Sequence, residues 1–356
     1  MSETSPVLSR RQLIKWTGGA LGVTALGSAA VALSGGTASA VSASARFDLT
    51  DASDELFREI WLQETRVLQS FSFDNTNKHL YAVGLVQGGR QLPGESRAYT
   101  GTEREANGDL CVTRLDLTGA IIGRMYLKGF GHGVSIAAEP SGNSAYLWTE
   151  TDSVQALDSA TGQYIGWGTR LARFKFANGA VLTPTSPQLT KYSPVAGADR
   201  TTIAIDPVNS RLAVRHRPGS TGSTFKYNLY DLATFTAGTF TPLATMTQPA
   251  GLGTFQGFTS LGQYLYLIDG NSYSDSNPSP GNTYITSVDW NTGTTKQREL
   301  TKAGTSLLFR EPEGLAIQIP NTADTTKCRL VMGFASSASD TDSNRKASFY
   351  YKDSLV

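Results

Sequence analysis

A segment of paired strands that recurs five times along the chain constrains the fold more than any other feature of the sequence. Each copy begins with a polar residue and a small residue, continues with alternating apolar positions, passes a turn, and enters a second β-rich run. Alternation with period two, interrupted by Pro, Gly, Asn and Asp, is typical of paired strands. The chain is therefore predicted to be all-β. The five copies begin at Gln69, His132, Thr201, Gln256 and Glu313.

A second motif, an Asp followed within a few residues by Thr or Gly, lies between these copies. Its four occurrences are Leu115–Gly119, Leu157–Gly162, Tyr230–Thr234 and Val288–Gly293. Asp accepts hydrogen bonds from the backbone two residues on, and Gly supplies a positive φ, so each occurrence predicts a hairpin between the third and fourth strands. Five four-stranded antiparallel units predict a five-bladed β-propeller. A two-sheet sandwich, the competing architecture, does not account for five copies of one motif.

The two ends of the body are expected to complete the last blade together. The fifth copy reaches Asp353 without a fourth strand. Residues Ala45 to Thr50 are predicted to supply that strand, so that the last blade is closed by the N-terminal strand of the mature chain. Closure of this kind removes an open sheet edge. Helix is expected in one place, Ala52 to Gln63, as a short segment on the rim.

Residues 1–40 read as a twin-arginine signal peptide. Arg10 and Arg11 precede an uncharged run from Thr17 to Ala40 that ends in small residues, which is the pattern of a cleavable export signal. The alternative is a membrane anchor, which the many Gly, Ser and Thr residues of the run disfavour. The rest, residues 46–356, is expected to form a single propeller domain, secreted or associated with the cell wall, with no membrane contact in the mature form.

Charge and cysteine content exclude several classes of partner and site. Lys and Arg number 31 against 30 Asp and Glu, so the chain lacks the basic excess that nucleic-acid binding requires. The two cysteines, Cys111 and Cys328, either form one bridge after export or remain as two buried thiols. No Cys and His cluster has zinc spacing, and no acidic loop has the twelve-residue calcium spacing, so no metal and no cofactor are expected.

The candidate site lies at one mouth of the central channel. The first strand of each blade lines the channel, so the five starting residues should form a ring there, and the long loops between second and third strands should surround it. Arginine forks match phosphate oxygens, while amides, carboxylates and aromatic faces suit sugars. Alternatively, the ring satisfies its own hydrogen bonds, and Glu313 pairs locally with Arg310. The predicted ligand-binding residues are Gln69, His132, Gln256, Glu313, Arg215, Arg217, Arg90 and Tyr273.

The segment Leu68–Asn75, running into His79-Leu80-Tyr81, resembles the propeller domain shared by staphylococcal phage receptor-binding proteins and the major teichoic acid biosynthesis protein C of Gram-positive bacteria. The resemblance extends from about Arg46 onward, and the starts at His132, Gln256 and Glu313 are similar in style. It implies a five-bladed propeller and a ligand drawn from wall teichoic acid or a related glycopolymer. Thr201 departs from the pattern, since a larger polar residue is expected there.

Two functions follow as hypotheses. The first is a secreted propeller that binds an anionic cell-wall glycopolymer, built of sugar or polyol phosphates, at the mouth. The alternative is a secreted hydrolase or lyase that cleaves teichoic acid or a related polysaccharide, with His132 and Glu313 as the candidate catalytic acid and base. Propeller geometry alone does not choose between them.

Overall fold

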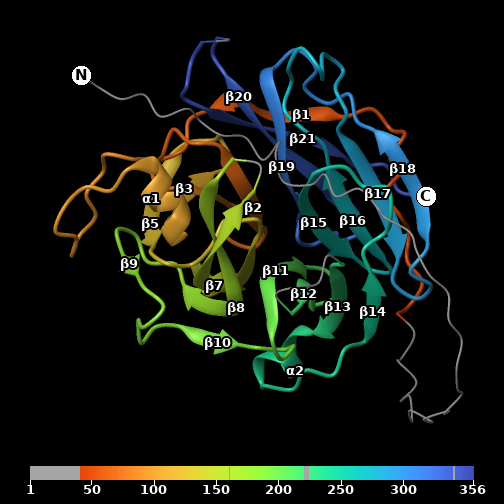
Figure 1. Cartoon of the computed structure of the whole chain (residues 1–356). Helices are drawn as coiled ribbons and strands as arrows, with labels where there is room; N and C mark the ends of the chain where they lie inside the picture. The colour runs from red at the N-terminus through yellow and green to blue at the C-terminus, as the bar shows by residue number, and fades with distance from the viewer. Residues whose placement is uncertain (1–40, 160, 220–223, 340) are drawn as a thin grey trace, which may run out of the picture.

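Five antiparallel sheets arranged around one axis make up the computed structural model, which describes residues 41–159, 161–219, 224–339 and 341–356 (Figure 1). Blade 1 contains β2 (Leu68–Asp74), β3 (His79–Leu85), β4 (Leu110–Asp116) and β5 (Ile121–Leu127), extended by a short parallel strand, β9 (Val181–Leu182). Blade 2 contains β6 (Ile136–Ser141), β7 (Ser144–Asp158), β8 (Gln163–Lys175) and β10 (Thr190–Tyr192).

The other three blades follow in chain order. Blade 3 contains β11 (Ala198–Asp206), β12 (Arg211–Pro218), β13 (Lys226–Asp231) and β14 (Ala244–Thr247). Blade 4 contains β15 (Phe255–Leu261), β16 (Tyr264–Asp269), β17 (Tyr284–Asp289) and β18 (Thr295–Leu300). Blade 5 contains β19 (Leu308–Gln318), β20 (Arg329–Ser337), β21 (Lys346–Lys352) and β1 (Asp54–Ile60). Two short helices, α1 (Gly101–Asn107) and α2 (Leu232–Thr236), lie in loops.

The inner strands β2, β6, β11, β15 and β19 contact one another in that order, and β19 returns to β2. Side chains of these strands hydrogen bond across the blade boundaries: Ser72 Oγ accepts from Ala138 N at 3.1 Å, and Ser135 Oγ accepts from Ile203 N at 2.7 Å. All five inner strands line a narrow cavity on the axis, with Phe71, Ile136, Ala204, Thr259 and Leu315 among its residues. The predicted five-bladed propeller is therefore confirmed.

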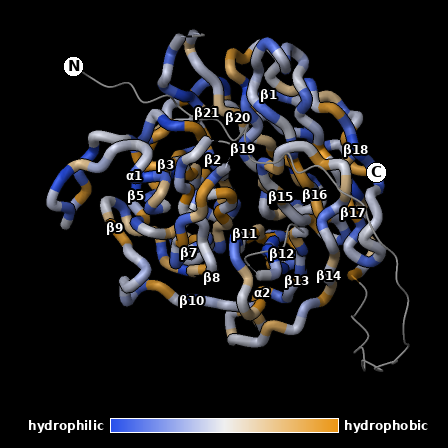
Figure 2. Tube along the Cα trace, in the orientation of Figure 1, coloured by the Kyte–Doolittle hydropathy of each residue, from blue (hydrophilic) through white to orange (hydrophobic). Residues whose placement is uncertain are grey.

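A separate hydrophobic core fills each of the five boundaries between neighbouring blades. Because a sheet buries an apolar face only against another layer, the ring is stabilised at every boundary rather than by one central core. Figure 2 shows the apolar stretches along the strands and a hydrophilic stretch at β12. One representative pair at each boundary, in ring order from blades 1 and 2, is Val112 and Leu147, Trp148 and Leu212, Leu229 and Leu267, Ile285 and Leu330, and Phe349 and Phe71.

Closure of the last blade by a strand from the N-terminal side is confirmed, but the closing strand is not the predicted one. β1 pairs antiparallel with β21 (Figure 1). It lies at Asp54–Ile60, within the segment expected to be helical, and the helix prediction is wrong. Two register shifts, between Glu55 and Phe57 and between Phe57 and Ile60, break the period-two alternation, so the apolar spacing imitates a helix.

The segment predicted to close the blade, Ala45 to Thr50, also meets the C-terminal end of the chain, but through a single bridge. Phe47 pairs with Leu355, and the backbone of Arg46 exchanges two hydrogen bonds with Val356. Phe47 is fully buried and its N–H donates to the Tyr266 hydroxyl at 3.0 Å. This segment therefore anchors the N-terminal side on blade 4, next to the closing strand.

The hairpin of blade 2 also differs from the prediction. The motif Leu157–Gly162 was expected to join the third and fourth strands, but it turns between β7 and β8, the second and third. Asp and Gly suit any tight hairpin, so the motif does not say which two strands it joins. β7 and β8 are long strands of 15 and 13 residues, and both of them contact α1.

Both cysteines are free and buried. Cys111 lies on β4 among Val86, Leu92 and Tyr126, and Cys328 precedes β20 and donates to the carbonyl oxygen of Thr325. Of the two alternatives left open by the sequence, the structure shows two thiols. Residues 1–40, where the signal peptide is predicted, lie outside the described residues. Within residues 41–356, apart from the positions not described, neither helix is long and apolar enough to cross a bilayer.

Candidate functional site at the channel mouth

The predicted ring positions coincide with irregularities at the start of the inner strands. The ladder register shifts at Gln69 in blade 1, at Thr201 in blade 3, at Gln256 in blade 4 and at Glu313 in blade 5. A bulge re-aims a side chain and is common next to functional sites. In blade 2, His132 precedes β6. All five side chains are buried, none more than 4% exposed.

Small residues that follow the ring positions bring neighbouring inner strands together. A Cβ at Gly257 would lie 2.6 Å from the Cα of Gly314, and one at Gly314 would lie 3.4 Å from the Cα of Ser70. The Ser70 hydroxyl donates to the carbonyl oxygen of Gly133 at 2.7 Å. The strand starts therefore converge on a shared axis, and the "polar then small" pattern of the sequence is the packing requirement of that convergence.

Glu150 of β7, which the sequence analysis did not single out, holds the blade 2 side of the mouth. Its fully buried carboxylate accepts from the N–H of Gly133 and of Val134 through Oε1, at 2.7 and 3.4 Å, and from Gly168 N through Oε2, at 2.7 Å. The carboxylate thereby replaces ladder hydrogen bonds that the loop before β6 does not make. Burial raises the pKa of Glu150 to about 7, although the backbone N–H groups act in the opposite direction.

This raised pKa predicts how stability depends on pH. The folded protein holds a proton on Glu150 that the unfolded chain releases above its usual pKa of 4.5, so the free energy of unfolding should fall as pH rises from 4.5 through 7. One group contributes at most about 1.4 kcal/mol per pH unit. Urea unfolding at half-unit steps should show this decline in the wild type and a flatter profile in Glu150→Gln. Identical slopes in the two proteins would contradict the assignment.

An aromatic and a cation lie beside His132 at the boundary of blades 2 and 3. The indole of Trp167, on β8, packs against the imidazole of His132 with ring centroids 5.0 Å apart, and the Arg200 guanidinium lies 4.4 Å from the indole centroid. Both Trp167 and Arg200 are partly exposed. Thr201 Oγ1 donates to the carbonyl oxygen of Thr169 at 3.5 Å, which ties the start of β11 to β8.

Two predicted arginines of β12 lie in the same region but have partners of their own. Arg215 is almost fully buried between the rings of Phe225 and Phe255, at 3.4 and 3.7 Å, and donates to Gln248. Arg217 forms a two-pronged ion pair with Asp199, with Nε donating to Oδ1 at 2.7 Å. The guanidinium groups of both arginines are therefore engaged within the protein.

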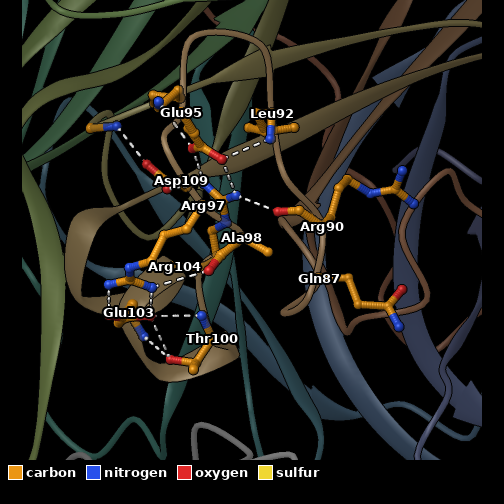
Figure 3. A network of polar contacts seen from close by, with 12 residues as sticks. Gln87, Arg90, Leu92, Glu95, Arg97, Ala98, Thr100, Glu103, Arg104 and Asp109 are labelled. Carbon is orange, nitrogen blue, oxygen red and sulfur yellow. Dashed lines mark hydrogen bonds and ion pairs between the residues drawn. The ribbon is translucent and has the colours of Figure 1, made fainter.

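The arginines of the β3–β4 loop are engaged in the internal contacts of blade 1. Arg90 pairs with the buried Glu64 at 2.8 Å, next to Tyr126 of the outer strand β5. Arg104 is fully buried and donates to Glu95, Asp109 and the carbonyl oxygen of Arg90 (Figure 3). The structure therefore places Arg90 over the outer part of blade 1 and not beside the ring residues.

The remaining predicted residues lie in blades 4 and 5. Tyr273, in the β16–β17 loop, is partly exposed; its N–H donates to the carbonyl oxygen of Phe309 at 2.7 Å, and its ring lies 5.4 Å from the Arg310 guanidinium. Arg310 is fully buried and donates to the carbonyl oxygens of Ala303 and Thr301. His132 and Glu313, the candidate acid and base, lie at the starts of blades 2 and 5, and blade 1 stands between these two blades. No group of three His, Cys, Asp or Glu able to hold a metal occurs among the described residues.

Three residues of the mouth escaped the sequence analysis, and each left a local signal. Glu150 is a carboxylate that directly follows the apolar half of its strand, Trp167 stands between two glycines, and Arg200 directly precedes the ring position Thr201. The packing explains why position 168 is a glycine: a Cβ there would lie 2.4 Å from the Cβ of Glu150. Glycines on both sides of an exposed aromatic are therefore a sign that another strand or carboxylate approaches closely.

These features define a five-bladed β-propeller platform with a polar mouth at the start of its inner strands. Residues 67–350 match the family model of the phage 5-bladed beta propeller receptor binding platform domain. The chain belongs to this family.

Two relatives accompany the family match. A protein of Bacillus subtilis (strain 168) that carries the provisional name major teichoic acid biosynthesis protein C is 29% identical over 278 residues, which cover 76% of this chain and 57% of the relative. The tail fiber of Staphylococcus aureus phage P68 superposes with a TM-score of 0.62 at 18% identity, over 86% of this chain and 54% of the fiber. The likeness to the tail fiber is a likeness of fold alone. The chain spans little more than half the length of either relative.

Proposed function

We propose that this protein is exported and binds an anionic cell-wall glycopolymer, a chain of sugar or polyol phosphates, at the mouth of its channel. One observation supports this most: the partly exposed indole of Trp167 and guanidinium of Arg200 lie together beside the ring of buried polar starts. An aromatic face suits the C–H face of a sugar or polyol, and a guanidinium suits a phosphate oxygen. Membership of a receptor-binding platform family and the provisional name of the Bacillus relative point in the same direction.

Positive charge is concentrated locally at the start of blade 3, although the molecule as a whole is nearly neutral. Arg200, Arg215 and Arg217 gather at the start of blade 3, whereas the chain as a whole carries a formal net charge of +1. Local positive charge on a nearly neutral molecule favours recognition of one repeated anionic unit over general adhesion to polyanions. Export by the twin-arginine route, the expectation for residues 1–40, would bring the folded mouth to the cell wall.

Retention on purified cell walls tests the proposal. We expect the wild type to sediment with native walls and to remain in solution with walls stripped of teichoic acid. Trp167→Ala should lower retention at least tenfold, while Trp61→Ala should not, because Trp61 follows the outermost strand of blade 5 and is 45% exposed there. Equal retention on native and stripped walls, or equal loss in the two variants, would contradict the proposal. Incubation with purified polymer should release no new chain ends; their appearance would favour the hydrolase alternative.

A further inference from the structure

Arg200 has an unusual backbone and lies at the mouth. Its φ is +49°, a left-handed conformation that residues other than glycine rarely adopt, and it falls inside the register shift between Asp199 and Thr202. Strain of this kind persists where the surrounding structure fixes it, and it is frequent at ligand sites. The bulge turns the Arg200 side chain onto the indole of Trp167, at the boundary of blades 2 and 3.

The charges around Arg200 leave its own charge poorly compensated. Asp199, the nearest acid in sequence, is bound by both prongs of Arg217. The carboxylate of Glu150 is occupied by backbone N–H groups. Burial, followed by repulsion from Arg217 and Arg215, lowers the pKa of Arg200 to about 10, and the opposite effects of Asp199 and Glu150 do not offset this. The buried Nε of Arg200 has no hydrogen-bond partner among the described residues.

A partly exposed guanidinium that lies 4.4 Å from an indole centroid, beside two other arginines and with the nearby acids already engaged, is suited to bind an anion. We propose that Arg200 and Trp167 form a subsite for one phosphodiester group of the polymer, with the phosphate on the guanidinium and the adjoining polyol or sugar carbons on the indole. This inference rests on the proposed function and adds to it the position of the charged group. A diester carries a single negative charge on two free oxygens, which matches the fork of one arginine.

Calorimetric titration of the full chain with glycerophosphoglycerol, a soluble phosphodiester, tests the subsite. We expect measurable binding by the wild type, at least a tenfold weaker affinity in Arg200→Gln, an intermediate affinity in Arg200→Lys, and no change in Arg124→Gln, whose arginine is exposed on the outer strand β5 of blade 1. Methyl glucuronide, a carboxylate probe, should bind more weakly than the diester. Equal affinity for the two probes, or unchanged diester affinity in Arg200→Gln, would overturn the inference.

Thermal melting in the absence of polymer separates a loss of phosphate binding in Arg200→Gln from a loss of stability. Inorganic phosphate should raise the melting temperature of the wild type over an equal concentration of chloride and leave that of Arg200→Gln unchanged. In chloride alone Arg200→Gln should melt no lower than the wild type, since it removes a crowded cation; a lower value with a retained phosphate response would refute the subsite. Wall retention is read separately. Wild type that binds the diester through Arg200 but not walls would refute the proposed function alone.

Discussion

Replacing Arg104 by alanine is expected to cost about 3–5 kcal/mol in the free energy of unfolding, because it removes the cation that the buried carboxylates of Glu95 and Asp109 share and leaves only Lys128 beside Glu95. The fully buried guanidinium donates to both oxygens of Glu95, at 2.5 and 2.7 Å, and to Asp109 at 2.7 Å (Figure 3). These contacts lower the pKa of Glu95 to about 2. The stability that Glu95 contributes is therefore present above pH 4.5 and lost as pH falls toward 2. Urea unfolding at pH 7 measures the loss.

Arg97 provides the matched control for this prediction, since it belongs to the same loop. It pairs with Glu103 at 2.5 Å, but the two side chains are 55% and 38% exposed. Exposed pairs contribute about 1 kcal/mol or less, so Arg97→Ala should be nearly neutral. Similar losses in Arg97→Ala and Arg104→Ala would mean that Arg104 does not organise the loop. A large difference would confirm that the buried Arg104, and not the exposed Arg97, stabilises the β3–β4 loop.

Gly257→Ala is expected to destabilise the propeller by about 2–5 kcal/mol, through backbone strain and overpacking together. The φ of Gly257 is +156°, and a Cβ would meet the backbone of Gly314 at 2.6 Å, so neither inner strand can move without disturbing the boundary of blades 4 and 5. Thermal and urea unfolding both report the change. Diester affinity should survive in the folded fraction, because the Arg200 subsite lies at another boundary.

Gly251→Ala separates the two contributions to that loss. Gly251 also has a positive φ, +78°, but nothing lies within 4 Å of a Cβ built there. Only the backbone contribution remains, which is about 1 kcal/mol. If both alanine variants lost the same stability, close contact of the strand starts would not be the reason for Gly257. The convergence of inner strands on one axis would then lack its clearest packing evidence.

The sequence was sufficient to predict the propeller, because five copies of one alternating pattern leave few other arrangements. The same reasoning failed where local chemistry is shared by different structures. Asp54–Ile60 has helical spacing only because two register shifts displace its apolar residues. The turn at Asp158 joins an earlier pair of strands than its counterparts, since Asp and Gly serve any hairpin equally well.

The candidate site was predictable only in part. Gln69, Thr201, Gln256 and Glu313 could be aligned because each starts a repeat, and the structure places each in a bulge. Glu150 and Trp167 could not, because they lie on second and third strands and reach the mouth only through the pairing of an unusually long hairpin. The sequence also does not show which acid an arginine pairs with. It therefore cannot distinguish Arg90, which is paired with Glu64, from Arg200, whose charge is poorly compensated.

A structure of the complex with a short glycerol phosphate oligomer tests the central claim most directly. The account predicts that the oligomer lies across the channel mouth at the boundary of blades 2 and 3, with a phosphate oxygen within hydrogen-bond distance of the Arg200 guanidinium and the glycerol carbons against Trp167. An oligomer bound on an outer strand, or at the opposite end of the channel, would contradict it.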